Sequence, residues 1–137
     1  MLKEIYEQVE VMDNVFRGRI NFETYDLHSD TLEDLSKEDI RNITIVASGT
    51  SYNAGLMGKY YLEEFASIPV DVIVSAEFKY KKKFINPETL FIFVSQSGET
   101  IDALDSMKIV IQQGGRLLGV DEAQASAIAR LAGRALY

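Results

Sequence analysis

The amino-acid sequence predicts an α/β fold in which helices cover both faces of a parallel sheet. From residue 43 onward, short apolar runs alternate with helical segments, and this alternation is typical of βαβ units. Right-handed crossovers between parallel strands then give a three-layer, doubly wound sheet. Two of the apolar runs lead directly into hydroxyl-rich turns, so the predicted sheet carries polar groups where its strands end.

Before residue 43 we expect one amphipathic helix and a connecting segment. Apolar residues recur at spacings of three and four over residues 2–16, which predicts a helix there. Residues 18–39 are rich in Asp, Ser and Thr and weakly periodic, so we expect a surface segment with a short helix near Leu32. The chain is therefore treated as one domain overall, with 1–42 as helix and connector and 43–137 as the core.

Five strands and four helical segments are expected in the core. Pro69 and the pair Gly114-Gly115 stand just before two of the strands and mark the ends of the preceding helices. Gly55 lies on a predicted helix face where a small residue allows close packing on the sheet. The predicted strands are 43–47, 70–74, 90–94, 116–120 and 134–136, and the predicted helical segments are 52–66, 76–81, 100–113 and 124–132.

The composition excludes several classes of protein. The chain has 137 residues, 47% of them hydrophobic, which argues for a folded core and against disorder. No apolar run approaches the roughly 20 residues that span a bilayer, and no secretion signal is recognisable, so we expect a cytoplasmic protein. The chain has no cysteine, and its one histidine is His28, so we expect neither a metal nor another cofactor.

The charge balance argues against nucleic acid as a partner. The formal net charge is −7, and an acidic surface repels a phosphate backbone. Lys79 and the run 81–83, with Tyr80 and Phe84 nearby, form too short a basic surface to reverse this, and we interpret them as a solvated loop. An anionic ligand would therefore need a local site made by particular groups.

The two hydroxyl-rich turns are the candidate site. Residues 95–100, Ser-Gln-Ser-Gly-Glu-Thr, follow one apolar run, and residues 48–51, Ser-Gly-Thr-Ser, follow another. Hydroxyls, an amide and unpaired N–H groups at the start of a helix can hold a phosphate, and such sheets bind ligands at the carboxyl ends of their strands. We therefore expect Ser51 to face the 95–100 turn, with one phosphorylated sugar between them.

An ordinary helix cap is the alternative interpretation of these turns. Ser or Thr with Glu99 close by is a common capping arrangement that needs no ligand. The residues alone leave both interpretations open. Walker and dinucleotide-binding loops are excluded, because Gly-Lys-Ser/Thr and Gly-x-Gly-x-x-Gly are missing.

Three segments, in their order and spacing, resemble a known family. They are similar to the first sugar isomerase (SIS) subdomain of glutamine:fructose-6-phosphate amidotransferase, also called glucosamine-6-phosphate synthase, and the similarity extends over essentially the whole chain. The segments are Gly49-Thr50-Ser51-Tyr52-Asn53-Ala54-Gly55, Ser75-Ala76-Glu77-Phe78-Lys79-Tyr80-Lys81 and Ser95-Gln96-Ser97-Gly98-Glu99-Thr100. The resemblance implies five parallel strands flanked by helices, and a phosphate bound by Ser51, Ser95, Gln96, Ser97 and Thr100, supported by Gly49, Thr50 and Gly98.

The resemblance also implies a ligand and a partner. The ligand would be a phosphorylated hexose such as fructose 6-phosphate or glucosamine 6-phosphate, and the partner a second copy of the chain, with the apolar face of helix 2–16 as a possible contact. The family's cysteine nucleophile and second isomerase subdomain are missing from this sequence, so we expect half of an isomerase unit, catalytically incomplete alone. Residues 121–125, Asp-Glu-Ala-Gln-Ala, depart from the family pattern, and their acids are expected near the rim of the site, where they would weaken anion binding.

Three functions remain open at this point. The first is a sugar-phosphate-binding domain. The second is a minimal aldose–ketose phosphate isomerase with Glu64 as the base, since proton transfer between two sugar carbons needs a carboxylate within reach of both; a solvated helix face is the simpler interpretation of Glu63 and Glu64. The third is a regulatory or structural module whose turns are merely capped.

Overall fold

The computed structural model describes residues 2–36, 38–80, 85–123 and 125–137. The chain forms two compact units, Met1–Glu38 and Asp39–Tyr137. The predicted basic run 81–83, Phe84 and the first residue of the predicted helix 124–132 lie outside the described residues. Among the described residues, no helix combines the length and the apolar character that crossing a membrane requires.

The first unit contains the predicted N-terminal helix and a hairpin that the sequence did not predict. The helix α1 spans Leu2–Phe16, as expected, and the short α2 spans Asp30–Ser36. Between them, β1 (Ile20–Asn21) and β2 (Asp26–Leu27) pair antiparallel. Strands of two residues are too short to show an alternating pattern, and their turn is held instead by the Asn21 side chain, whose Oδ1 accepts the Glu23 N–H at 2.9 Å.

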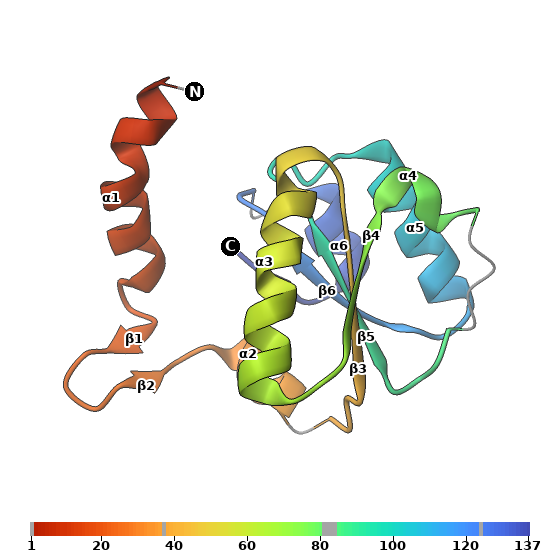
Figure 1. Ribbon diagram of the computed structural model, residues 1–137, viewed down its shortest axis with the longest axis horizontal. Coiled ribbons are helices and arrows are strands. Elements are labelled where there is room, and N and C mark those ends of the chain that lie inside the picture. Colours follow the sequence, from red (N-terminus) through yellow and green to blue (C-terminus); the bar gives the residue numbers. More distant parts are fainter. Residues whose placement is uncertain (1, 37, 81–84, 124) are drawn as a thin grey trace. The chain divides into compact units, whose positions relative to one another are not determined.

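Five parallel strands form the sheet of the second unit (Figure 1), which confirms the predicted fold class. Their order in the sheet is β4-β3-β5-β6-β7, and each neighbouring pair is parallel. Every strand lies within one residue of its predicted bounds. The strands are β3 (Asn42–Ala47), β4 (Val70–Val74), β5 (Thr89–Val94), β6 (Arg116–Val120) and β7 (Ala135–Leu136).

Helices cover both faces of this sheet. Figure 1 shows α3 on one side of the strands and α4 and α5 on the other, and α5 contacts both α4 and α6. The helix α3 begins three residues before the predicted start, because Ser48 is its extended N-cap and the next three residues form its first turn. The helices are α3 (Gly49–Ala66), α4 (Ser75–Phe78), α5 (Ile101–Gln112) and α6 (Ala127–Ala132).

The core lies between the sheet and the α4–α5–α6 face. Phe78 packs edge-on against Phe91 at 6.0 Å and against Phe93 at 6.3 Å between ring centroids, the geometry that aromatic pairs prefer. Met107 of α5 is fully buried beside them. On the other face, α3 packs closely at Gly55, where an added Cβ would lie 2.9 Å from a methyl group of Ile45. Both faces of the sheet are therefore packed, as the apolar strands predict.

The order in which the chain adds strands across the sheet reverses at β3 and β5, which are parallel neighbours in the middle of the sheet. After β3 the chain crosses to β4 on one side, and after β5 it crosses to β6 on the other. The loops that leave the two strands therefore diverge toward opposite faces. In open α/β sheets this divergence leaves a crevice at the carboxyl ends of the two strands.

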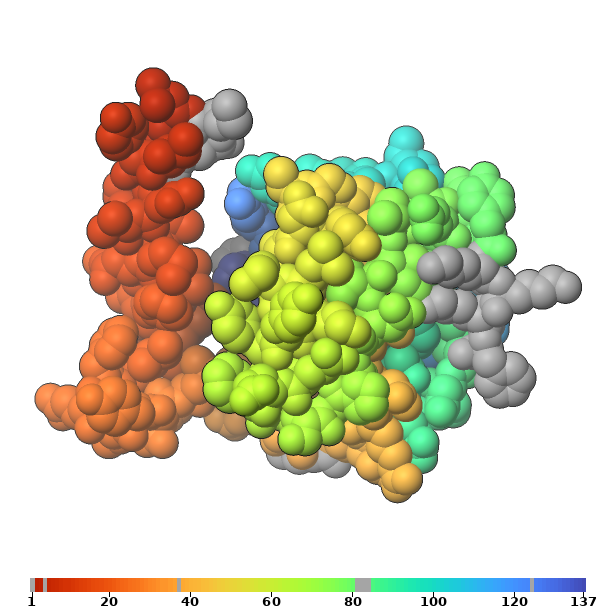
Figure 2. Space-filling view, in the orientation of Figure 1, coloured from red at the N-terminus to blue at the C-terminus, as the bar shows by residue number. Residues whose placement is uncertain are grey.

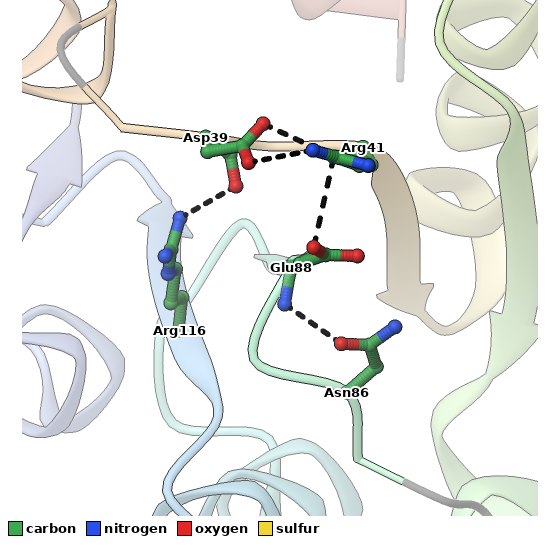
Figure 3. A network of polar contacts seen from close by, with 5 residues as sticks. All are labelled: Asp39, Arg41, Asn86, Glu88 and Arg116. Carbon is green, nitrogen blue, oxygen red and sulfur yellow. Dashed lines mark hydrogen bonds and ion pairs between the residues drawn. The ribbon is translucent and has the colours of Figure 1, made fainter.

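A charged network lies at the end of the sheet where β3, β5 and β6 begin, opposite the crevice (Figure 3). Arg41 binds Asp39 at 3.1 Å and Glu88 at 3.6 Å between nitrogen and oxygen, while Arg116 donates to the Asp39 carbonyl at 3.0 Å. The Glu88 N–H is held by Asn86 Oδ1 at 2.9 Å. The hydrogen bond and charge of Arg41 lower the pKa of Asp39. Ion pairs and hydrogen bonds thus link the segments that lead into β3, β5 and β6 at this end of the sheet.

Candidate functional site

A pocket of about 290 Å³ lies at the carboxyl ends of β3, β4 and β5. It occupies the crevice where the sheet order reverses, the position at which such sheets bind ligands. All five candidate phosphate-binding residues line it, together with Gly49 and Thr50, whereas Gly98 does not. The lining residues are Ser48, Gly49, Thr50, Ser51, Ser75, Val94, Ser95, Gln96, Ser97, Thr100 and Ala103.

The pocket wall is polar but uncharged in the part of the chain that the structure describes. Its polar side chains are hydroxyls and one amide, with no Lys, Arg, His, Asp or Glu among the described lining residues. A group held here would be bound by neutral hydrogen bonds and by the positive ends of helices. A wall of this kind suits an anion only if backbone N–H groups are free to bind it.

Two helix N-termini meet the pocket without being capped. Ser48 is the N-cap of α3 and Thr100 is the N-cap of α5, yet neither side chain makes a capping hydrogen bond. The first N–H groups of a helix have no partner within the helix, so those of α3 and α5 are not satisfied by their own N-cap side chains. This geometry favours the ligand-binding interpretation of the turns over the capping one.

The 95–100 loop is shaped by hydrogen bonds between its own residues. Ser95 Oγ and Thr100 Oγ1 lie 2.9 Å apart, and Ser95 Oγ also accepts the Gly98 N–H at 3.2 Å. Ser97 Oγ accepts the Glu99 N–H at 3.2 Å. Ser95 is buried, while Gln96 and Ser97 are exposed. The buried Ser95 therefore holds the loop, and the side chains of Gln96 and Ser97 are exposed to solvent.

Glu99 caps a different helix from the one that its position in the sequence suggests. Its carboxylate accepts the Ala127 N–H at 2.8 Å, at the first residue of α6. The next N–H of α6, from Ile128, binds the Gly98 carbonyl at 3.0 Å, and the Ala129 N–H binds Ser126 Oγ at 3.0 Å. The first three N–H groups of α6 are thus all satisfied, two of them by the loop itself.

The acids after β6 do not line the pocket. Asp121 was expected near the rim, but it is 5% exposed, and its carboxylate accepts Ser126 Oγ at 2.7 Å and the Ala123 N–H at 2.9 Å. Glu122 is exposed and outside the lining. Asp121 therefore orders the loop before α6, because a buried carboxylate needs hydrogen-bond donors.

One acid does stand in the first turn of α5. Asp102 binds Lys79 of the α4 C-cap at 3.1 Å. The hydrogen bond and charge of Asp102 raise the pKa of Lys79, so Lys79 stays a cation. The pairing neutralises the carboxylate that would otherwise oppose an anion at the N-terminus of α5.

Glu64 is not brought to the pocket. It is exposed near the C-terminal end of α3, about 20 Å along the helix axis from Ser51 at a helical rise of about 1.5 Å per residue. Figure 2 shows the side chains of α3, in yellow to yellow-green, on the surface of the second unit. The neighbouring Glu63 accepts the Val70 N–H at 3.1 Å and pairs with Lys59 at 3.2 Å, so it holds the start of β4.

Sequence reasoning missed Ser75 as a lining residue. It follows directly after β4, as Ser48 follows β3 and Ser95 follows β5. A serine after each of three neighbouring strands was a signal that could have identified it. It also opens one of the three segments that carry the family resemblance, Ser75 to Lys81, but no role was assigned to it there. Among the described residues, no group of three or more His, Cys, Asp or Glu side chains is placed to hold a metal ion.

Comparison with known proteins agrees with the resemblance seen in the sequence. Residues 26–137 match the SIS domain. The glutamine–fructose-6-phosphate aminotransferase (isomerizing) of Clostridium tetani is 44% identical over 140 residues, a match that covers all of this chain and 23% of that protein. The corresponding enzyme of Caldanaerobacter subterraneus is 41% identical, with the same coverage. This chain therefore spans less than a quarter of the length of these relatives.

Solved structures give the same result. The C-terminal domain of glucosamine-fructose-6-phosphate aminotransferase from Francisella tularensis superposes with a TM-score of 0.87 at 33% identity, over 98% of this chain and 37% of that one. These matches confirm the relation to the isomerase part of such enzymes. The chain belongs to the SIS domain family.

Proposed function

We propose that this chain binds a phosphorylated sugar by its phosphate group at the carboxyl ends of β3 and β5. The observation that carries the proposal is the pair of uncapped helix N-termini, α3 and α5, at one uncharged pocket. Backbone N–H groups and helix dipoles bind anions without a charged side chain. The phosphate ligands would be Ser51, Ser95, Gln96, Ser97 and Thr100, supported by the backbone of Gly49 and Thr50, while Gly98 lies outside the lining and supports the site by shaping the loop.

The names of the relatives favour a hexose phosphate as the ligand. The Clostridium tetani protein is named for fructose 6-phosphate. A deaminase named for glucosamine 6-phosphate, from Thermotoga maritima, shares the fold with a TM-score of 0.76 at 23% identity. The pocket volume of about 290 Å³ is at the small end of ordinary small-molecule sites, about 300–1,000 Å³. Fructose 6-phosphate and glucosamine 6-phosphate are therefore the ligands to test.

We propose further that binding here is not accompanied by catalysis. Moving a proton between two sugar carbons needs a group of suitable pKa within hydrogen-bond reach. The described lining residues include no carboxylate, imidazole or amine. The pocket therefore supplies the phosphate-binding part of an isomerase-type site, and the acid–base groups would have to come from elsewhere.

Calorimetric titration tests the proposal. Fructose 6-phosphate is titrated into the intact chain, and fructose, which lacks the phosphate, serves as the control ligand. We expect binding of the phosphosugar, no binding of fructose, and a higher Tm in the presence of the phosphosugar by mass action. A folded chain that binds fructose as well as its phosphate, or binds neither at millimolar concentration, would contradict the proposal.

We propose that a second copy of the chain is the partner and that the two form a homodimer. Its support is the apolar face of α1, on which Tyr6 is 79% and Val9 82% exposed, since burying apolar surface favours association. Sedimentation equilibrium of the chain and of its V9E variant tests this assembly. We expect a dimer for the first and a shift to monomer for the second, whereas a monomeric parent chain would refute it.

A further inference from the structure

Ser75 has an unusual environment in the wall of the pocket. It is fully buried, with 0% of its surface exposed, and it lines the pocket beside residues from the ends of β3 and β5. Its Oγ has no hydrogen-bond partner among the described residues. Buried hydroxyls in proteins almost always have a partner, so this one needs an explanation.

The backbone of Ser75 is fixed, so the hydroxyl cannot simply move away with it. The Ser75 carbonyl accepts Ser106 Oγ of α5 at 3.2 Å, and the same Ser106 hydroxyl is 2.7 Å from the Asp102 carbonyl. Ala103, one helical turn before Ser106, is also buried against this region. The contacts hold Ser75 under the first turn of α5, where the phosphosugar site begins.

An unpartnered buried hydroxyl makes the free protein less stable, because it loses hydrogen bonds to water and gains none. A ligand oxygen or a nitrogen in the pocket would supply the missing partner. The other serines that follow the neighbouring strands, Ser48 and Ser95, line the same pocket. Ser75 thus occupies the equivalent position on a third strand, with a hydroxyl left over.

We propose that the Ser75 hydroxyl hydrogen-bonds to an oxygen of the bound phosphosugar, as a ligand-binding residue contributed by the end of β4. The inference rests on the proposed function of the same pocket. It adds a residue outside both hydroxyl-rich turns, and it predicts effects of opposite sign on ligand affinity and on the stability of the free protein.

The test compares S75A with S106A in the intact chain. Both serines are fully buried, but Ser106 has hydrogen-bond partners and lies outside the lining. We expect S75A to weaken fructose 6-phosphate binding about tenfold in calorimetry while leaving the ligand-free Tm unchanged or higher by up to about 5 °C. S106A removes the hydrogen bond to the Ser75 carbonyl, so it should lower Tm by a few degrees and weaken binding by less than S75A does.

The outcomes separate this inference from the proposed function. If the parent chain binds no phosphosugar, both fail. If the parent binds and S75A binds equally well, or if S75A lowers Tm as S106A does, only the role of Ser75 is overturned. Titration with inorganic phosphate locates the contact: a loss for both ligands places it at the phosphate and a loss for fructose 6-phosphate alone places it at the sugar, and either result supports the inference.

Discussion

The 95–100 loop contacts the N-termini of both α5 and α6, but the first N–H groups of the two helices differ in whether they have hydrogen-bond partners. At α6, Glu99, Gly98 and Ser126 satisfy the first three N–H groups. At α5, the N-cap Thr100 makes no capping hydrogen bond and uses its hydroxyl to hold Ser95 instead. The closed helix end therefore fixes the loop in place, and the open one is left available for a ligand. In the proposed function, stability and phosphosugar binding thus depend on two different helices.

The largest effect is expected from closing the space between the loop and α6. Gly98 has a φ of +64°, and a Cβ added there would lie 2.3 Å from the Ser126 Cβ. We expect G98A to destabilise the fold by about 3–5 kcal/mol in urea denaturation, from backbone strain and overpacking together. Gly114 is the control, since its φ is +73° and a Cβ would meet nothing within 4 Å. Equal losses for G98A and G114A would show that the loop is not packed on α6 as described.

The next largest effect comes from making α5 resemble α6. T100D supplies the open helix end with a capping carboxylate, which competes with an anionic ligand for the same N–H groups and repels it. We expect phosphosugar affinity to fall at least about a hundredfold, or about 3 kcal/mol, while the free protein is as stable as the parent or about 1 kcal/mol more so. T100S keeps the hydroxyl and should bind like the parent chain. Unchanged affinity in T100D would place the ligand away from α5.

A smaller effect is expected from removing a capping hydrogen bond at the N-terminus of α6. E99A removes the acceptor for the Ala127 N–H, and the loss of a helix cap costs about 1–2 kcal/mol. We expect a loss of stability of that size in urea, accompanied by weaker phosphosugar binding because the loop loses its anchor. The nearby exposed acid Glu122 provides the control, since E122A should change stability by less than about 0.5 kcal/mol. Equal free energies of unfolding for E99A and E122A would show that Glu99 does not stabilise the N-terminus of α6.

The smallest effect is expected near the C-terminal end of α3, where Glu63 accepts the Val70 N–H and pairs with Lys59. Hydrogen bonds from the Val70 N–H and from Lys59 lower the pKa of Glu63 below its ordinary value of 4.5. A carboxylate whose pKa is lowered in the folded state stabilises the protein when the pH is above the ordinary pKa. This stabilisation is lost as the pH falls through the folded-state pKa. The Tm advantage of the parent chain over E63Q should therefore be present at pH 7 and shrink toward pH 3. A constant difference in thermal denaturation would contradict this role.

The sequence predicted the fold well because the relevant patterns are local. Apolar runs such as 43–47 and 90–94 identify strands wherever they lie, and α1 was predicted with its correct bounds for the same reason. The two-residue strands β1 and β2 carry no such pattern. Strand order, which sets the pocket at the meeting of β3 and β5, is also not a property of any one segment.

Side-chain partners distant in the chain were beyond such reasoning. Glu99 lies close in sequence to the start of α5, so a local pattern suggested a cap there, but its partner is Ala127. Asp121 was expected at the rim because it follows the strand β6, yet its carboxylate is buried and accepts a hydrogen bond from the Ser126 hydroxyl. In both cases a contact between separate segments decides the role, and only the folded arrangement contains it.

The open ends of α3 and α5 have a consequence for the folding of the protein as well as for recognition. If the proposed phosphosugar binds the N–H groups at these ends, it would add about 2.7 kcal/mol to the free energy of unfolding when present at a hundred times its Kd. The concentration of that metabolite would then set the folded fraction of the chain as well as the occupancy of its pocket.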